Sequence, residues 1–187
     1  MSRDPEALAL PGFLFLYQPS FSMLEWRMRE MLVTIPEDLA TLAERVLEEI
    51  APRSRSERGA TVLALHGELG AGKTAFVQAL ARVLGVSEYV TSPTFVVMRR
   101  YPIKAHVFFE TLVHMDAYRI ESIAELAVLG FQEALGIPQN LICIEWAGNI
   151  AEVLPEGALH ITFSHSDAPG EGALRKVVYG YKTETER

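Results

Sequence analysis

The run Gly67–Thr74, with the sequence GELGAGKT, constrains the fold of this 187-residue chain more than any other feature. It fits the phosphate-binding pattern G-x-x-x-x-G-K-[ST] without a mismatch. Glycines let successive backbone N–H groups turn toward an anion, and the N-terminus of a following helix adds partial positive charge. The pattern predicts a nucleoside triphosphate site, with Lys73 on the β- and γ-phosphates and Thr74 on the accompanying Mg²⁺.

The flanking segments distinguish this loop from a glycine-rich turn with an incidental lysine. Thr61–His66 has the pattern of a buried strand, and Ala75–Leu84 that of a helix that stops at Gly85. Strand, glycine loop and helix in this order are the expected context of a phosphate loop. We therefore expect the nucleotide to contact Glu68, Leu69, Gly70, Ala71, Gly72, Lys73, Thr74 and Ala75.

Composition and charge limit the other possibilities. The chain is 49% hydrophobic and 22% charged, which is typical of a globular domain with a substantial core. A net charge of −7 argues against strong direct binding of nucleic acid, which needs a basic surface. If nucleic acid matters to this protein, we expect a partner to hold it. No apolar stretch is long enough to span a bilayer, so we expect no membrane association and a cytoplasmic protein.

The first 30 residues differ from the rest. They carry scattered aromatic residues and three prolines without clean periodicity, and Met23, Met28 and Met31 follow. Two interpretations stay open: translation starts later than Met1, or residues 1–30 form an accessory extension. We expect residues 31–187 to form a single phosphate-loop domain.

The other predicted elements complete an α/β fold. A helix is expected over Pro36–Ile50, with Thr34 as its cap, and helical structure over Glu121–Leu135, with a break at Gly130. Strands are expected over Thr94–Tyr101, Val107–Met115, Leu141–Trp146, Leu159–Phe163 and Leu174–Tyr181; the first two form an antiparallel hairpin, and so do the last two. Helices alternate with strands early and hairpins come later. This order predicts a mixed sheet with a parallel core and helices on both faces.

Two acidic residues stand at strand ends. Glu145 follows the apolar run 141–144, and Asp116 follows the less uniform run 111–115. Ligands of open α/β sheets bind beyond the carboxyl ends of the strands, and hydrolysis needs acids that hold Mg²⁺ and position water. An acid that caps a helix or bonds a turn is the alternative for either one. We expect Lys73, Asp116 and Glu145 to be catalytic, and Thr74, Asp116 and Glu145 to bind the metal, with the division of roles between the two acids left open.

Further residues near the acids are ambiguous by themselves. Trp146 is either a core aromatic, the commoner role, or a lid over the site. His114, Tyr118 and Arg119 around Asp116 each have the character of surface or core residues. The guanine-recognising pattern Asn-Lys-x-Asp does not occur in the sequence, which favours adenine.

Four motifs in this order resemble one family. They are the loop Gly67–Thr74, the segment Thr91–Phe95 (TSPTF), the segment His114–Arg119 (HMDAYR) and Ile144–Trp146 (IEW). Together they resemble the bacterial TsaE family, small ATPases of tRNA threonylcarbamoyladenosine biosynthesis. The likeness covers about Thr34 to Tyr181.

The resemblance implies more than the loop alone. It implies ATP and Mg²⁺ binding, slow hydrolysis, and action within a complex with the TsaB–TsaD threonylcarbamoyl transferase, which holds the tRNA. It also implies that Thr91–Phe95 is a loop that senses the γ-phosphate, with Thr91 near the metal, and that Trp146 closes over the nucleotide. Two other classes remain open from the residues: a small-molecule kinase with the same loop, and an interaction module that binds nucleotide without turnover.

Overall fold

The computed structural model describes residues 28–34, 36, 38–54, 59–165 and 174–181. Within these residues the strands are β1 (Arg29–Thr34), β2 (Thr61–His66), β3 (Met98–Pro102), β4 (Thr111–Asp116), β5 (Asn140–Glu145), β6 (Leu159–His165) and β7 (Leu174–Tyr181). The helices are α1 (Leu39–Ser54), α2 (Lys73–Val83), α3 (Ile123–Val128), α4 (Phe131–Leu135) and the 3-10 segment η1 (Ala147–Val153).

The strands form one mixed sheet in the order β1-β7-β6-β2-β5-β4-β3. Strand β2 pairs in parallel with both β5 and β6, and β4 pairs in parallel with β5. The outer pairs β3–β4, β6–β7 and β1–β7 are antiparallel. The predicted parallel core with antiparallel hairpins is therefore confirmed, and the carboxyl ends of β2, β4 and β5 lie at one edge of the sheet.

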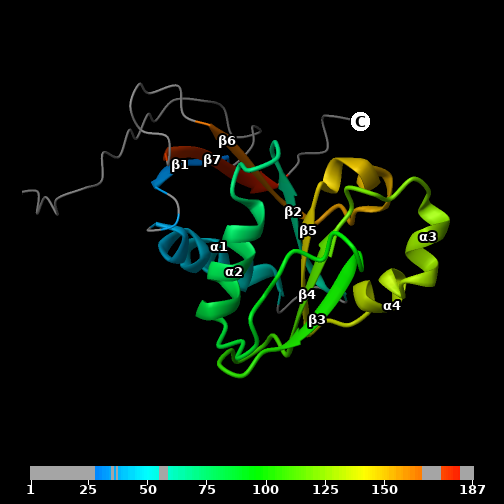
Figure 1. Ribbon diagram of the computed structural model, residues 1–187. Coiled ribbons are helices and arrows are strands. Elements are labelled where there is room, and N and C mark those ends of the chain that lie inside the picture. Colours follow the sequence, from blue (N-terminus) through cyan, green and yellow to red (C-terminus); the bar gives the residue numbers. More distant parts are fainter. Residues whose placement is uncertain (1–27, 35, 37, 55–58, 166–173, 182–187) are drawn as a thin grey trace, which may run out of the picture.

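Helices cover both faces of this sheet, as the sequence predicted. Helices α1 and α2 lie on one side and α3, α4 and η1 on the other (Figure 1). Along β2, Leu63 and Leu65 belong to the core beneath α1 and α2, whereas Val62 and Ala64 belong to the core on the opposite face. Because successive strand residues point to opposite faces, a strand that is covered on both faces is largely apolar.

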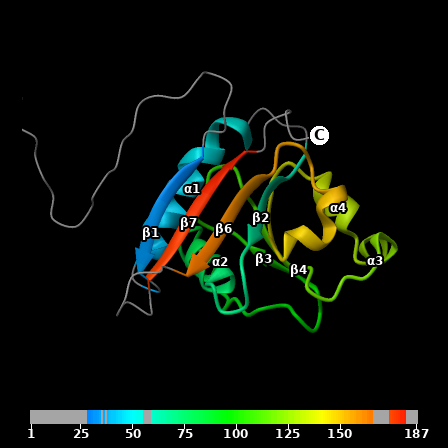
Figure 2. The ribbon, with the colours of Figure 1, turned by 90° about the horizontal axis from the view of Figure 1, so that it is seen from above.

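The sheet is extended at one end by the antiparallel strands. Figure 2 shows β6, β7 and β1 side by side, with α1 against them. Strand β1 was not predicted, and Thr34 ends this strand instead of capping the helix. Helix α1 begins only at Leu39, after a turn in which Asp38 accepts a 2.8 Å hydrogen bond from the backbone N–H of Thr34.

The predicted first hairpin is real, but its strands are shorter than expected. Strand β4 begins at Thr111, because the ring of His106 accepts the backbone N–H groups of Phe108 and Phe109 and so forms a turn. Strand β3 begins at Met98, because the preceding segment loops toward the end of β4. Residues 1–27 of the predicted extension lie outside the described residues, and its boundary stays a prediction. In the part that is described, no helix is long and apolar enough to cross a membrane.

Candidate nucleotide and metal site

The loop between β2 and α2 has the backbone of an anion cradle. Gly67, Gly70 and Gly72 have φ angles of 130°, 77° and 109°, a region that side chains rarely tolerate. A Cβ at Gly67 would lie 2.3 Å from the carbonyl oxygen of Phe163 on β6. Helix α2 begins at Lys73, so its N-terminal N–H groups face the loop.

Lys73 is held inside this loop. Its side chain is 4% exposed, and Nζ donates hydrogen bonds to the carbonyl oxygens of Gly67, at 2.7 Å, and Glu68, at 2.8 Å. Burial lowers the pKa of Lys73, against the opposing attraction of Glu145 and Asp116. The structure therefore holds the Lys73 ammonium group inside the loop, where the motif predicts that it contacts phosphate oxygens.

Glu145, at the end of β5, joins the loop to the sheet. The hydroxyl of Thr74 donates to Oε1 and Oε2 of Glu145, at 2.7 and 2.9 Å. The ring nitrogen Nε2 of His114, on β4, lies 2.8 Å from Oε1. Glu145 is 4% exposed and His114 is fully buried. Such a carboxylate needs these partners, because a buried charge is costly without them.

Asp116 lies beside Glu145, since the two residues are register partners on β4 and β5. Its Oδ2 accepts a 2.6 Å hydrogen bond from the hydroxyl of Thr94, and its Oδ1 accepts the backbone N–H of Tyr118 at 2.9 Å. The sheet thus brings both predicted acids to one edge, each bonded to a different neighbouring segment.

Thr94, and not Thr91, is the threonine of its loop that contacts an acid. The hydroxyl of Thr91 instead accepts a 3.3 Å hydrogen bond from Arg99. The predicted position of Thr91 near a metal stays a prediction. From the sequence, Thr94 was expected only as part of the sensing loop Thr91–Phe95, and His114 only as a surface or core residue. The signal for His114 was its spacing from Asp116, because residues two apart on a strand share a face.

Trp146 covers the lysine and is only half-buried, so it is not a core aromatic. Its ring centroid lies 4.1 Å from Nζ of Lys73 and 5.0 Å from the ring centroid of Tyr118. Its backbone is left-handed, with φ 57°, which turns the chain sharply after Glu145. Trp146 thus contacts Lys73 on one side and the tilted ring of Tyr118 on the other.

The oxygen donors here are of the kind that Mg²⁺ prefers. The hydroxyl of Thr74 and the carboxylate of Glu145 are hard oxygen ligands, with Asp116 adjacent. In the described part of the chain, no group of three or more His, Cys, Asp or Glu could bind a metal by itself. Mg²⁺ usually takes one or two protein ligands together with phosphates and water, which matches this arrangement.

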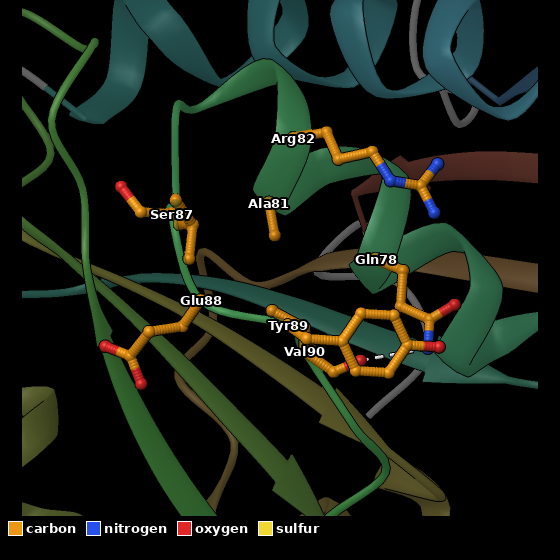
Figure 3. A pocket seen from close by; sticks show the side chains of 8 residues that line it. Gln78, Ala81, Arg82, Ser87, Glu88, Tyr89 and Val90 are labelled. Atoms are coloured by element: carbon orange, nitrogen blue, oxygen red, sulfur yellow. Dashed lines mark hydrogen bonds between the residues drawn. The ribbon is translucent and has the colours of Figure 1, made fainter.

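A separate cavity of about 230 Å³ lies along α2, away from the loop (Figure 3). It is lined by Gln78, Ala81, Arg82, Val86, Ser87, Glu88, Tyr89 and Val90. None of these residues carries a predicted site role. The amide of Gln78 donates a 2.9 Å hydrogen bond to the carbonyl of Val90, which ties α2 to the chain just before Thr91 (Figure 3).

Comparison with known proteins finds a match that includes the same motifs. The family model described as threonylcarbamoyl adenosine biosynthesis protein TsaE matches residues 33–173. The chain belongs to the TsaE family. The match spans the phosphate loop, Thr94, both acids and Trp146, so the resemblance drawn from the motifs is confirmed.

Individual relatives carry the same description. The chain is 37% identical to a TsaE protein of Treponema pallidum over 122 residues, which cover 65% of this chain and 78% of that protein. It is 39% identical to a TsaE protein of Bacillus subtilis over 105 residues, which cover 56% of this chain and 62% of the relative. The crystal structure of Bacillus subtilis YdiB superposes with a TM-score of 0.61 at 26% identity, covering 84% of this chain and 87% of that one. This likeness supports the mixed α/β fold independently of the motifs.

Proposed function

We propose that this TsaE-family chain binds and slowly hydrolyses Mg-ATP to support turnover of a TsaB–TsaD threonylcarbamoyl transferase in tRNA threonylcarbamoyladenosine modification. One observation carries the ATPase part: Lys73 and Thr74, consecutive residues at the start of α2, contact the loop carbonyls and Glu145 respectively. The names of the relatives support the pathway.

The loop would bind the phosphates. Lys73 would exchange its contacts with the carbonyls of Gly67 and Glu68 for phosphate oxygens, which are better partners for an ammonium. Backbone N–H groups of the loop and of the first turn of α2 would complete the cradle. Because Lys73 is buried, this charge would act in a site from which water is largely excluded.

The two acids would divide the remaining work according to their partners. Glu145 and Thr74 would hold the ion, and bound Mg²⁺ would neutralise charge on the phosphates. Asp116 would orient the attacking water and report on the γ-phosphate through Thr94. Trp146 would cover the site from the side of Tyr118 and limit access of bulk water.

The charge of the chain supports an indirect role toward RNA. With 24 acidic against 17 basic residues, the protein is poorly suited to neutralise a phosphate backbone. We propose that the TsaB–TsaD pair holds the tRNA and that the complex acts in the cytoplasm. The ATPase would then reset the complex between turnovers.

The test is ATP hydrolysis by the chain alone, and with TsaB–TsaD and tRNA from the same source. We expect weak hydrolysis alone, clear stimulation by the pair, and loss of both in Lys73→Ala. Lys104→Ala, at an exposed lysine, is the matched control and should behave as wild type. Tight ATP binding without hydrolysis in any mixture would favour the interaction module, and transfer of phosphate to a metabolite would favour the kinase.

A further inference from the structure

We infer that His114 is a positioning residue, which fixes the carboxylate of Glu145 for its work on the metal and nucleotide. The kinetic side of this inference rests on the proposed ATPase function, whereas the hydrogen bond itself does not. Among the described residues, the side-chain hydrogen bond of His114 goes to Glu145, so its effect would be transmitted through Glu145.

The sheet explains why this histidine reaches this acid. In the register of β4 and β5, His114 lies opposite Cys143, two residues before Glu145. Diagonal neighbours of this kind share a face and lie within reach of long side chains. The ring is fully buried, and its Nε2 lies 2.8 Å from Oε1 of Glu145. The geometry is thus fixed by backbone pairing in the centre of the sheet, and a surface loop could not hold it as firmly.

The chemistry of the two groups sets the direction of the hydrogen bond. An ionised carboxylate can only accept, so Nε2 of His114 carries the hydrogen and donates it to Glu145. The other ring nitrogen, Nδ1, is buried without a hydrogen-bond partner among the described residues. An acceptor nitrogen can stay bare there more cheaply than an N–H group could. The site therefore selects one tautomer, with its single donor on Glu145.

The hydrogen bond between His114 and Glu145 matters more once the Thr74 hydroxyl binds a metal ion. In this structure, Thr74 and His114 are the side chains bonded to the Glu145 carboxylate within the described residues. If the Thr74 hydroxyl turns to the metal, His114 is the side chain that still restrains the carboxylate. It binds Oε1 and leaves one lone-pair direction and Oε2 for other ligands. A restrained carboxylate acts without a reorganisation cost at the moment of reaction.

Two substitutions separate positioning from bulk packing. The amide nitrogen of His114→Gln can take the place of Nε2, whereas the shorter side chain of His114→Asn cannot reach that point. We expect kcat for ATP hydrolysis with TsaB–TsaD and tRNA to fall roughly tenfold or more in His114→Asn, with KM little changed. His114→Gln should stay within about threefold of wild type. Equal losses in both variants, or a loss confined to KM, would overturn the inference.

A spectroscopic readout decides the contact without any turnover. In nucleotide-free protein labelled with ¹⁵N-histidine, we expect the His114 signal, assigned by its loss in His114→Gln, to show the Nε2–H tautomer and a slowly exchanging proton. Glu145→Ala should abolish that protection. An Nδ1–H tautomer, or a signal that does not change in Glu145→Ala, refutes the contact. If wild type never hydrolyses ATP, the proposed function fails, and this spectrum still decides whether His114 holds Glu145.

Discussion

Thr94 donates a 2.6 Å hydrogen bond to Oδ2 of Asp116 and so fastens the loop after Pro93 to the end of β4. The hydroxyl of Ser92 lies 2.7 Å from that of Thr94, which extends the contact one step further along the loop. The loop is also attached to α2 through Gln78 and Val90. A change at Asp116 therefore has a direct route to the segment that the family resemblance describes as a sensor.

We predict that Thr94→Val lowers partner-stimulated ATP hydrolysis about tenfold, while the affinity for ATP changes little. The substitution keeps the shape of the side chain but removes the donor to buried Asp116, and a hydrogen bond to a charged group carries about this weight. Thr94→Ser keeps the hydroxyl and serves as the control. Steady-state kinetics together with equilibrium ATP titration measure both quantities. Equal losses in the two variants would contradict the prediction, because Thr94→Ser keeps the hydroxyl that donates to Asp116.

The two acids should respond differently to loss of charge. We predict that Glu145→Gln and Asp116→Asn both lower kcat by about a hundredfold or more, with smaller effects on ATP affinity. Because Glu145 bonds Thr74, its variant should also need more Mg²⁺ for half-maximal activity, whereas Asp116→Asn should not. Mg²⁺ titrations of hydrolysis measure this. Glu110→Gln, on an exposed glutamate, is the control. A shifted Mg²⁺ requirement in Asp116→Asn alone would exchange the two roles.

The fluorescence of Trp146 should change when Lys73 exchanges its hydrogen bonds to the loop carbonyls for contacts with phosphate. Its ring centroid lies 4.1 Å from Nζ of Lys73, so phosphate binding at the lysine changes the charge next to the indole. We predict a change in tryptophan fluorescence on addition of Mg-ATP, measured in Trp26→Phe so that Trp146 is the one remaining tryptophan. The change should vanish when Lys73→Ala is added. A signal that persists without the lysine would mean that Trp146 senses something else.

The sequence predicted those parts of the site that depend on local pattern. The loop Gly67–Thr74 was found because glycine spacing and the flanking strand and helix are encoded within 25 residues. Asp116 and Glu145 were found because parallel strands deliver their carboxyl ends to the same edge. Both arguments need no knowledge of how distant segments pair.

The features that the sequence did not predict depend on how distant segments of the chain pair. Strand β1 exists because Arg29–Thr34 pairs with β7, almost 150 residues later, and nothing local in β1 indicates that partner. His114 meets Glu145 only through the register of β4 on β5. Thr94 reaches Asp116 because the segment predicted as the start of β3 leaves the sheet, with Val97 in a left-handed conformation that its β-branched side chain does not favour.

Burial of Lys73 should destabilise the nucleotide-free protein in a pH-dependent way. Because burial lowers the pKa of Lys73 below its ordinary 10.5, the unfolded chain holds this proton more tightly than the folded protein. The destabilisation caused by buried, charged Lys73 is largest below the folded-state pKa. It disappears as the pH rises from that pKa to about 10.5. We therefore predict that the free energy of unfolding of wild type rises relative to Lys73→Met as pH increases through this window. Urea titrations at several pH values, with both proteins free of nucleotide, measure the difference. A difference that is constant or falls with pH would contradict the prediction.

Gly67 should be less replaceable than Gly70, although both have positive φ. An alanine Cβ at Gly67 would lie 2.3 Å from the carbonyl oxygen of Phe163, and backbone on a central strand pair cannot easily give way. At Gly70 no described atom lies within 4 Å of the added Cβ, so Gly70→Ala meets only the strain of its φ of 77°.

We predict that Gly70→Ala costs about 1–2 kcal/mol of unfolding free energy, whereas Gly67→Ala costs about 1–3 kcal/mol more. Urea denaturation without nucleotide is the measurement, because both glycines lie in the phosphate loop and bound ligand would mask the difference. Equal costs would mean that β6 shifts away from the loop to accept the methyl group. A larger cost at Gly67 would show that β6 packs directly against the loop. The Phe163 carbonyl would then be the group that supports the loop at this position.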